Sequence, residues 1–242
     1  MSELKRIDAC AKRPIDIWTN YLYYPLSIRL VYLLRNTGVT PNGLTLSSLG
    51  MALIGCAAFA MGGCTAVWIG LILVQLSYVV DCADGQLARY RQQFSPIGGW
   101  LDQVADRIKE FAVYFSLAWG YTKHHPDRQD IWIWAMVALF ALYMLEYLGQ
   151  VDFLRKLNGS GGQDAQRTAA HSTPNDGFSR LQRLRALVPF RSFIIGEQYF
   201  TMLVFIAFLA IPPFFAFVSA LGLLMVFYRI AVSLYKWRRL TA

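Results

Sequence analysis

Charged residues are scarce in this sequence, and their scarcity limits what the protein can be. Of its 242 residues, 16% are charged, whereas 56% are hydrophobic and 15% are aromatic. Soluble domains carry about 25% charged residues, so the composition favours a protein of the lipid bilayer. A secretory signal is also missing from the first residues, which are polar and mixed in charge and lack an apolar core before a small-residue cleavage site. We therefore expect the N-terminus to stay in the cytoplasm.

Cysteine patterns of a metal site or a disulfide framework are absent as well. The four cysteines are Cys10, Cys56, Cys64 and Cys82, and three of them fall in apolar runs, so we interpret them as small hydrophobic residues. The sequence shows no internal repeat and no second domain. We expect residues 1–242 to form a single membrane-embedded domain, with a cytoplasmic or interfacial segment over 1–40 and a cytoplasmic loop over 155–195.

Long apolar runs are present, and they predict the fold class. A spanning helix needs about 20 mostly apolar residues, and six runs approach or exceed this length, the fifth being short. The predicted spans are 43–63, 65–88, 98–121, 130–153, 197–211 and 213–235. Before them, residues 15–38 mix aromatic and aliphatic residues with Arg29 and Arg35, which is typical of a helix lying in the membrane interface. The expected fold is all-α integral membrane, with six transmembrane helices and an N-terminal amphipathic interfacial helix.

The lysines and arginines outside these spans are distributed unequally. Six spans place both termini on one side, and that side holds all of these cations except Lys123 and Arg128. Because positive charge marks the cytoplasmic face, we expect both termini in the cytoplasm. The net charge of +8 then reflects topology, and no nucleic-acid partner is expected. The basic stretch 180–191 is expected to contact membrane lipid.

Four aspartates occur in this apolar setting, at the predicted cytoplasmic ends of the second and third spans. Residues three, four and seven apart share one face of a helix, so each span presents two acids beside small residues. The first face holds Asp81, Asp84, Gly85 and Ala88, and the second holds Gly98, Asp102, Ala105 and Asp106. The short link over 90–98 allows an antiparallel pair of helices on which all four acids converge.

Four carboxylates that converge in a low-dielectric site repel one another, and protons or divalent cations must offset the repulsion. Hard oxygen ligands favour Mg²⁺, Mn²⁺ or Ca²⁺ over zinc. A set of four carboxylates suits two such ions. The sequence therefore predicts a divalent metal site.

The stretch 81–106 fits the spacing D-x-x-D-G-x-x-A-R, eight residues, then G-x-x-x-D-x-x-x-D. At these residues the sequence resembles the CDP-alcohol phosphotransferase (CDP-alcohol phosphatidyltransferase) family, and it fills every signature position. The resemblance implies a metal-dependent enzyme that attacks a CDP-linked donor with an acceptor hydroxyl, transfers a substituted phosphoryl group and releases CMP. It implies Mg²⁺ or Mn²⁺ as cofactor, a role in phospholipid or polyol-phosphate lipid synthesis, a bacterial or archaeal plasma membrane, and a homodimer.

The resemblance also implies a role for each signature residue. Asp81, Asp84, Asp102 and Asp106 would ligate metal. Asp106 would also, or instead, take the acceptor proton, with Asp102 beside it in the catalytic machinery. Gly85, Ala88, Arg89 and Gly98 would line the nucleotide pocket.

The sequence does not determine the identity of the acceptor or which of the two substrates carries the lipid. The donor is CDP-diacylglycerol with a soluble alcohol, or a soluble CDP-alcohol with a lipid or polyol acceptor. The segment 13–30 and the motif residues look most like the inositol-phosphate and CDP-polyol branch. Four cations near the cytoplasmic loop and in the last span are candidates for binding an acceptor phosphate, although topology alone explains the first three: Arg155, Lys156, Arg191 and Arg229. Arg229 is alternatively a partner of Glu197 or of an aspartate.

The segment before the first span has two interpretations. Thr40 is placed as the N-cap of a helix and Pro41 as its first residue, which explains the sequence structurally. In the resembling family, a P-N-x-x-T segment at this place contacts the nucleotide, which would assign Pro41, Asn42 and Thr45 to the binding site.

Three other interpretations of the acids compete with the enzyme. The acids are structural if Arg89, Arg107 or Lys109 pairs with them. A cation-coupled membrane transporter would use the cluster as its ion site, although transporters usually show repeated halves and broken helices near the midplane. A scaffold that binds CDP-lipid without turnover does not require the complete set of acids.

Overall fold

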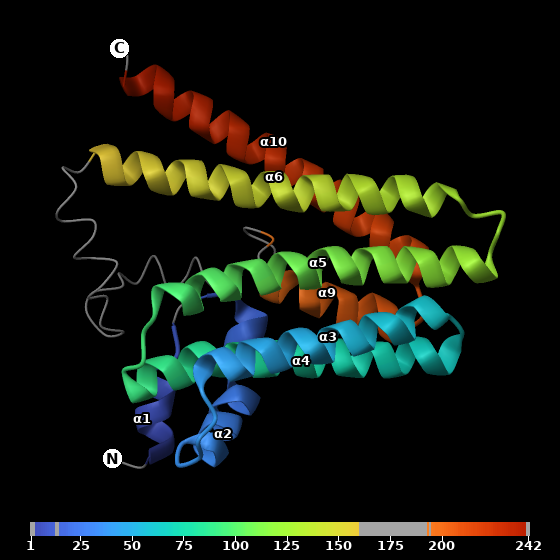
Figure 1. The fold of residues 1–242 in the computed structure, drawn as a ribbon. Helices are drawn as coiled ribbons and strands as arrows, with labels where there is room; N and C mark the ends of the chain where they lie inside the picture. The colour runs from blue at the N-terminus through green and yellow to red at the C-terminus, as the bar shows by residue number, and fades with distance from the viewer. Residues whose placement is uncertain (1–2, 13–14, 160–192, 194, 241–242) are drawn as a thin grey trace.

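A computed structural model of the chain describes residues 3–12, 15–159, 193 and 195–240. These residues form helices and short turns, and no strand occurs among them (Figure 1). The elements are α1 (Glu3–Ala9), the π-helical turn η1 (Thr19–Tyr23), α2 (Tyr24–Leu34), α3 (Pro41–Met61), α4 (Cys64–Arg91), α5 (Pro96–His124), α6 (Asp130–Gly159), α9 (Ile195–Ala207) and α10 (Ile211–Leu240).

Four of these helices contain a stretch that is long and apolar enough to cross a membrane. The stretches are Pro41–Met61, Cys64–Arg91, Asp130–Asp152 and Ile211–Tyr235. Of the other two predicted spans, 98–121 lies within α5, whereas 197–211 extends past the end of α9 at Ala207 to the first residue of α10. Helix α5 has 29 residues and carries charged side chains near its start, whereas α9 has 13 residues, fewer than the ~20 that a straight span requires.

Side-chain caps explain where α3 and α5 begin. The side chain of Thr40 accepts a hydrogen bond of 3.1 Å from the backbone N–H of Gly43, and Pro41 occupies the first helical position. This confirms the predicted helix start. The same arrangement opens α5, where Ser95 caps the helix ahead of Pro96. A cap satisfies a backbone donor that has no partner within the helix, so both starts are fixed locally.

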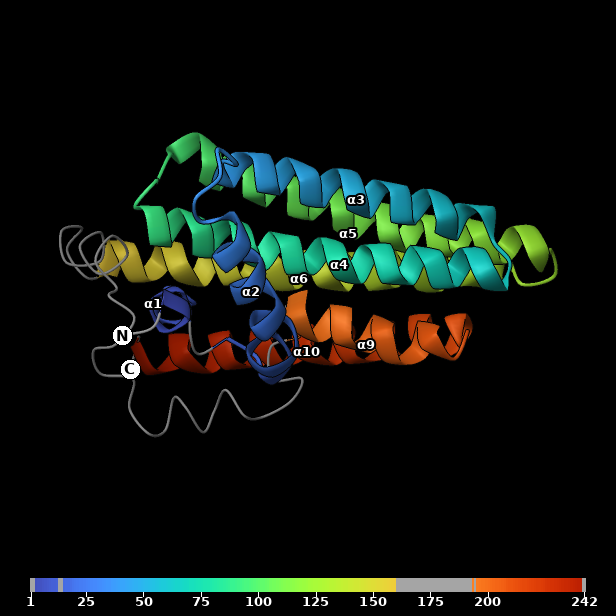
Figure 2. The same cartoon turned by 90° about the horizontal axis from the view of Figure 1, so that it is seen from below.

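Helix α3 packs closely against both α4 and α5. Glycines allow this approach: a Cβ atom at Gly70 of α4 would lie 2.8 Å from the carbonyl oxygen of Gly55 of α3, and one at Gly120 of α5 would lie 1.9 Å from that of Phe59. Small residues let helix backbones meet in this way. The remaining helices complete the bundle, with α6 beside α10 and α9 beside α4 and α10 (Figure 2).

Helices α4 and α5 run in opposite directions, as the short link between them predicts (Figure 1). Each packs mainly on α3, and α4 and α5 approach each other closely at few points among the described residues. Their acidic faces therefore meet across a space instead of a tight helix–helix contact.

The N-terminal elements pack against the C-terminal end of α4, which carries the aspartate motif. Ile7 and Ala11 are buried in one cluster with Leu87 of α4, and the hydroxyl of Tyr90 donates a hydrogen bond of 2.7 Å to Glu3. That hydrogen bond, with a second from Arg6, lowers the pKa of Glu3. The predicted amphipathic segment 15–38 is helical over η1 and α2. The buried apolar cluster joins the N-terminal region to the bundle.

Candidate functional site

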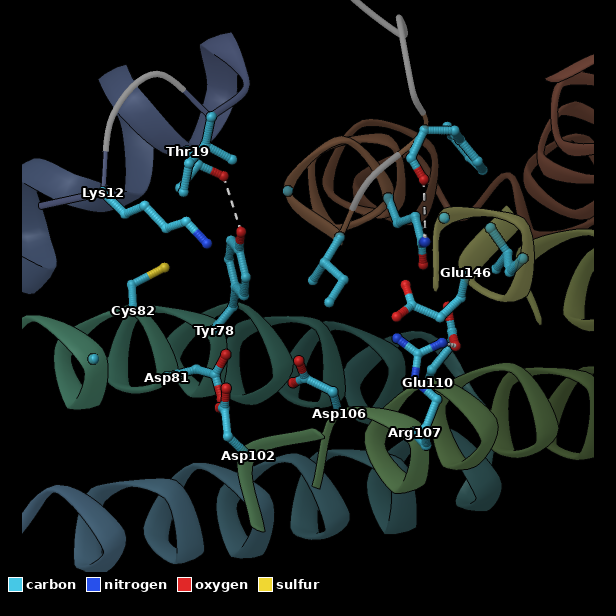
Figure 3. Close-up of a pocket in the computed structure, with 18 of the residues that line it drawn as sticks. Lys12, Thr19, Tyr78, Asp81, Cys82, Asp102, Asp106, Arg107, Glu110 and Glu146 are labelled. Carbon is cyan, nitrogen blue, oxygen red and sulfur yellow. Dashed lines mark hydrogen bonds and ion pairs between the residues drawn. The ribbon is translucent and has the colours of Figure 1, made fainter. Parts of the chain in front are cut away.

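Three of the four aspartates gather at one point between α4 and α5. Asp81 lies on α4, and Asp102 and Asp106 lie on α5. Each offers one carboxylate oxygen, and these oxygens all lie within 4.8 Å of one another (Figure 3). The residues are half-buried. Hard oxygens at this spacing fit a divalent cation, so the donor set suits the metal that the sequence predicts.

A buried lysine partly neutralises this cluster. The ammonium group of Lys109, 2% exposed, lies 2.9 Å from Asp106 and also donates a hydrogen bond to Asp81. Ser48 of α3 donates a second hydrogen bond, of 3.1 Å, to Asp81. One positive charge beside three carboxylates leaves the site negative, which favours the binding of further cations.

The fourth aspartate, Asp84, lies one turn along α4 and is 7% exposed. Its carboxylate accepts a hydrogen bond of 2.6 Å from the hydroxyl of Thr45 on α3. Asp84 is not among the three residues whose oxygens share the common point, but it lines the same cavity. The predicted quartet is thus a group of three with a fourth member held beside it.

One part of the interpretation in which basic residues pair with the acids agrees with the structure. Lys109 does pair with two of them, as described above. The two arginines bond elsewhere. Arg89 donates from Nε to the carbonyl of Cys10, and Arg107 pairs with Glu110 at 2.6 Å. Among the residues that the structure describes, the clustered carboxylates are therefore not paired with guanidinium groups.

A cavity of about 600 Å³ opens beside the carboxylates. Elements from both ends of the chain line it. The N-terminal region, α4 and α5 contribute Lys12, Ile15, Thr19, Tyr24, Tyr78, Asp81, Cys82, Asp84, Gly85, Arg89, Asp102, Asp106, Arg107 and Glu110, and the later elements contribute Leu142, Leu145, Glu146, Gly149, Gln150, Phe193, Ile195, Gly196, Gln198 and Arg229. This volume is in the range of small-molecule and cofactor sites.

Two of the seven residues predicted to bind the nucleotide line this cavity, and five do not. Gly85 and Arg89 line the cavity, and the guanidinium of Arg89 lies over Gly85, where a Cβ atom would come within 3.3 Å of Nη1. Five predicted contacts lie outside the lining residues: Ala88, Gly98, Pro41, Asn42 and Thr45. Gly98 instead faces α3, because a Cβ atom there would lie 2.7 Å from the side-chain oxygen of Asn42.

Of the predicted acceptor residues, Arg229 lines the cavity and donates a hydrogen bond of 2.8 Å to the carbonyl of Leu145. The side chains of Arg155 and Lys156, and the whole of Arg191, lie outside the described part of the structure.

Several lining residues carry polar groups that the motif does not include. Lys12, Glu110, Gln150 and Gln198 are examples. Glu110 has a sequence signal, because it follows Asp106 by four residues and so shares its helical face. Lys12 has none, since only the folding of the N-terminal region onto α4 brings it to the cavity.

A model of the family described as CDP-alcohol phosphatidyltransferase matches residues 38–165, just over half of the chain. The chain belongs to this family. The matched region includes α3, α4, α5 and all the described carboxylates of the cluster. Together with the four apolar helices, membership in the CDP-alcohol phosphatidyltransferase family makes the chain an integral membrane protein.

Two curated relatives are matched over part of their length. The chain is 36% identical over 112 residues to the bifunctional IPC transferase and DIPP synthase of Aquifex aeolicus. The aligned region covers 45% of this chain and 23% of that protein. It is 26% identical over 149 residues to the phosphatidylinositol phosphate synthase of Mycolicibacterium smegmatis, which covers 61% of this chain and 65% of that protein.

Crystal structures of phosphatidylinositol phosphate synthase from Mycobacterium tuberculosis share the fold. The apo form matches with a TM-score of 0.58 at 20% identity, over 84% of this chain and 93% of that one. Structures of the same enzyme with CDP-DAG bound and with manganese and citrate match with a TM-score of 0.55 each.

Proposed function

We propose that this protein is a metal-dependent CDP-alcohol phosphotransferase, which moves a substituted phosphoryl group from a CDP-linked donor to an acceptor hydroxyl and releases CMP. The observation that carries the proposal is the gathering of Asp81, Asp102 and Asp106 on the wall of a cavity of about 600 Å³. Family membership supports the same reaction. A relative with this fold binds CDP-DAG in its crystal structure, which supports a CDP-linked donor here.

The proposed cofactor is Mg²⁺ or Mn²⁺, as two ions held by Asp81, Asp84, Asp102 and Asp106. Such ions would stabilise the negative charge of the diphosphate and the negative charge that develops during transfer. The oxygen-only donor set favours these metals, and the manganese in a structure of a relative supports the choice.

We propose a role for each protein group from the family resemblance, and the position of these groups at the cavity supports it. The acceptor oxygen forms a bond to the donor phosphorus, the bond from that phosphorus to the CMP oxygen breaks, and the carboxylate of Asp106 takes the hydroxyl proton. Lys109 fixes the orientation of Asp81 and Asp106, while Thr45 fixes that of Asp84. Gly85 and Arg89 line the nucleotide end of the cavity.

For the acceptor, we propose an inositol-phosphate or related polyol. The names of the relatives from A. aeolicus and M. smegmatis support this branch. Arg229 lines the cavity, which supports a role in binding an acceptor phosphate. Arg155, Lys156 and Arg191 are proposed as further acceptor contacts on sequence grounds alone.

The proposed topology has six spans, with α5 and the short α9 added to the four apolar helices, and with α2 at the membrane interface. In this topology both termini and the site face the cytoplasm of a bacterium or archaeon. They share a side with most of the loop lysines and arginines, and an excess of positive loop charge marks the cytoplasmic face. We propose that the chain is a single membrane-embedded domain and that it works as a homodimer, as the family resemblance implies.

The test is CMP release by the purified protein with Mg²⁺ or Mn²⁺. CDP-DAG and several soluble CDP-alcohols are crossed against inositol phosphate, glycerol phosphate, serine and lipid acceptors. We expect CMP from at least one pair and none after chelation of the metal. Absence of CMP from every pair would refute the proposal and favour a cation-coupled transporter.

A further inference from the structure

Four described cations line the cavity, and three of them are already bonded to protein atoms. Arg89 donates to the carbonyl of Cys10, Arg107 pairs with Glu110, and Arg229 donates to the carbonyl of Leu145. The fourth is Lys12. Its ammonium group makes no hydrogen bond or ion pair with any residue that the structure describes.

The backbone around Lys12 is held in place, although its side chain is not. The preceding residue, Ala11, is 2% exposed in the cluster that joins the N-terminal region to α4. The hydroxyl of Tyr24 donates a hydrogen bond of 3.1 Å to the carbonyl of Lys12, and Arg89 binds the carbonyl of Cys10 two residues earlier. These contacts at Lys12 and at the two residues before it fix the point from which the side chain extends.

From this point the side chain reaches over the cavity. Figure 3 shows the nitrogen of Lys12 directed toward the hydroxyl end of Tyr78, above Cys82 and on the side opposite Asp102. Lys12 is exposed, so its ammonium group is hydrated and accessible to a ligand. The cavity therefore has carboxylates on one wall and an unpaired cation on another.

This distribution of charge matches a ligand that is itself anionic. A diphosphate that meets cations bound to the aspartates on one side has further oxygen atoms on its other side, and an ammonium group there forms charge-assisted hydrogen bonds with them. We propose that Lys12 binds the phosphate groups of the cytidine-diphosphate donor, so that the N-terminal region forms part of the donor site. The inference rests on the proposed function, since that function supplies the donor.

The test is calorimetric binding of CDP to the full-length protein in detergent micelles without added phospholipid, in the presence of Mn²⁺. Lys12→Gln should weaken CDP binding about tenfold, as expected for the loss of a hydrogen bond to a charged group. Lys12→Arg keeps the charge and should restore most of the affinity. Lys5→Gln is the matched control, because Lys5 is an exposed lysine of the same N-terminal region that does not line the cavity, and it should bind CDP like the wild type.

A second ligand separates phosphate binding from a structural effect. Cytidine carries no phosphate, so the dissociation constant of cytidine, measured by competition with CDP, should be the same in Lys12→Gln and in the wild type. Unchanged CDP affinity in Lys12→Gln would overturn the inference, and it is the result expected if Lys12 instead binds a lipid headgroup phosphate. Equal weakening of cytidine and CDP would also overturn it. A wild-type protein that binds no CDP would instead remove the proposed function itself.

Discussion

The hydroxyl of Thr45 on α3 donates a hydrogen bond of 2.6 Å to the carboxylate of Asp84 on α4. A residue of the helix-start segment and a residue of the aspartate motif, 39 positions apart, therefore form one unit. Thr45 does not line the cavity, whereas its partner Asp84 does.

Replacing Thr45 by valine keeps the shape of the side chain and removes the hydrogen bond. We expect kcat/KM to fall by about 10-fold or more, because hydrogen bonds to charged groups contribute about 1.5–3 kcal/mol. Steady-state CMP release measures the effect. Ser47→Ala is the control, since the exposed Ser47 hydroxyl donates a hydrogen bond to the carbonyl of Gly43 in its own helix. Equal activity of Thr45→Val and the control would show that Asp84 needs no such partner.

Replacing Asp106 by asparagine preserves size and removes the proposed proton acceptor. We expect turnover to fall by about 10²–10⁴-fold, while the protein still inserts and binds some metal through Asp81 and Asp102. CMP release and metal binding are measured on the same preparation. Asp130→Asn, at the far end of the bundle where Asp130 pairs with Arg128, should stay active. Full activity of Asp106→Asn would reject the assigned role.

Replacing Lys109 by methionine leaves Asp81 and Asp106 without their buried cation. Removing one partner of a buried ion pair costs about 3–5 kcal/mol, so the thermal unfolding midpoint should fall. Because Mg²⁺ would then offset more uncompensated charge, we expect it to raise the midpoint more in the variant than in the wild type. Thermal scans with and without Mg²⁺ test this. An equal Mg²⁺ effect in both proteins would show that the lysine and the metal act on different groups.

The close approach of α3 and α4 predicts a packing effect. In Gly70→Ala the added Cβ would lie 2.8 Å from the carbonyl of Gly55 and 2.6 Å from the ring of Phe59, so the helices must separate. We expect destabilisation of about 1–3 kcal/mol, seen as a lower unfolding midpoint. Gly50→Ala is the matched control, because a Cβ there meets nothing within 4 Å. Destabilisation of both variants alike would point to a cause other than packing.

The Glu3 carboxylate gives a pH-dependent contact. Its pKa is lowered from the ordinary value of 4.5 first by the hydrogen bond from Tyr90 and then by Arg6. The contact is therefore fully formed above that ordinary value and is lost as the pH falls through the lowered one. In Tyr90→Phe the titration midpoint of Glu3, followed by the NMR shift of a labelled carboxyl carbon, should rise. A midpoint that does not move would exclude Tyr90 as the main cause.

Local sequence determines much of the fold. The apolar length of α3, α4, α6 and α10 and the caps at Thr40 and Ser95 act over a few residues, so they can be predicted without a structure. The motif spacing likewise fixes which acids share a face, because the helical repeat does so. The helical character of α9 was predictable. Because α9 is shorter than a straight span, its sequence does not decide whether it crosses the membrane, and that depends on how it packs in the bundle.

Long-range packing decides the rest of the site. Whether Lys109 meets Asp81, whether Thr45 meets Asp84 and whether Lys12 reaches the cavity depend on how α3 and the N-terminal region pack on α4, through glycine contacts and buried side chains far apart in the chain. Spacing along one helix determines a residue's face, whereas the partner opposite that face belongs to another helix, and only the folded bundle brings the two together.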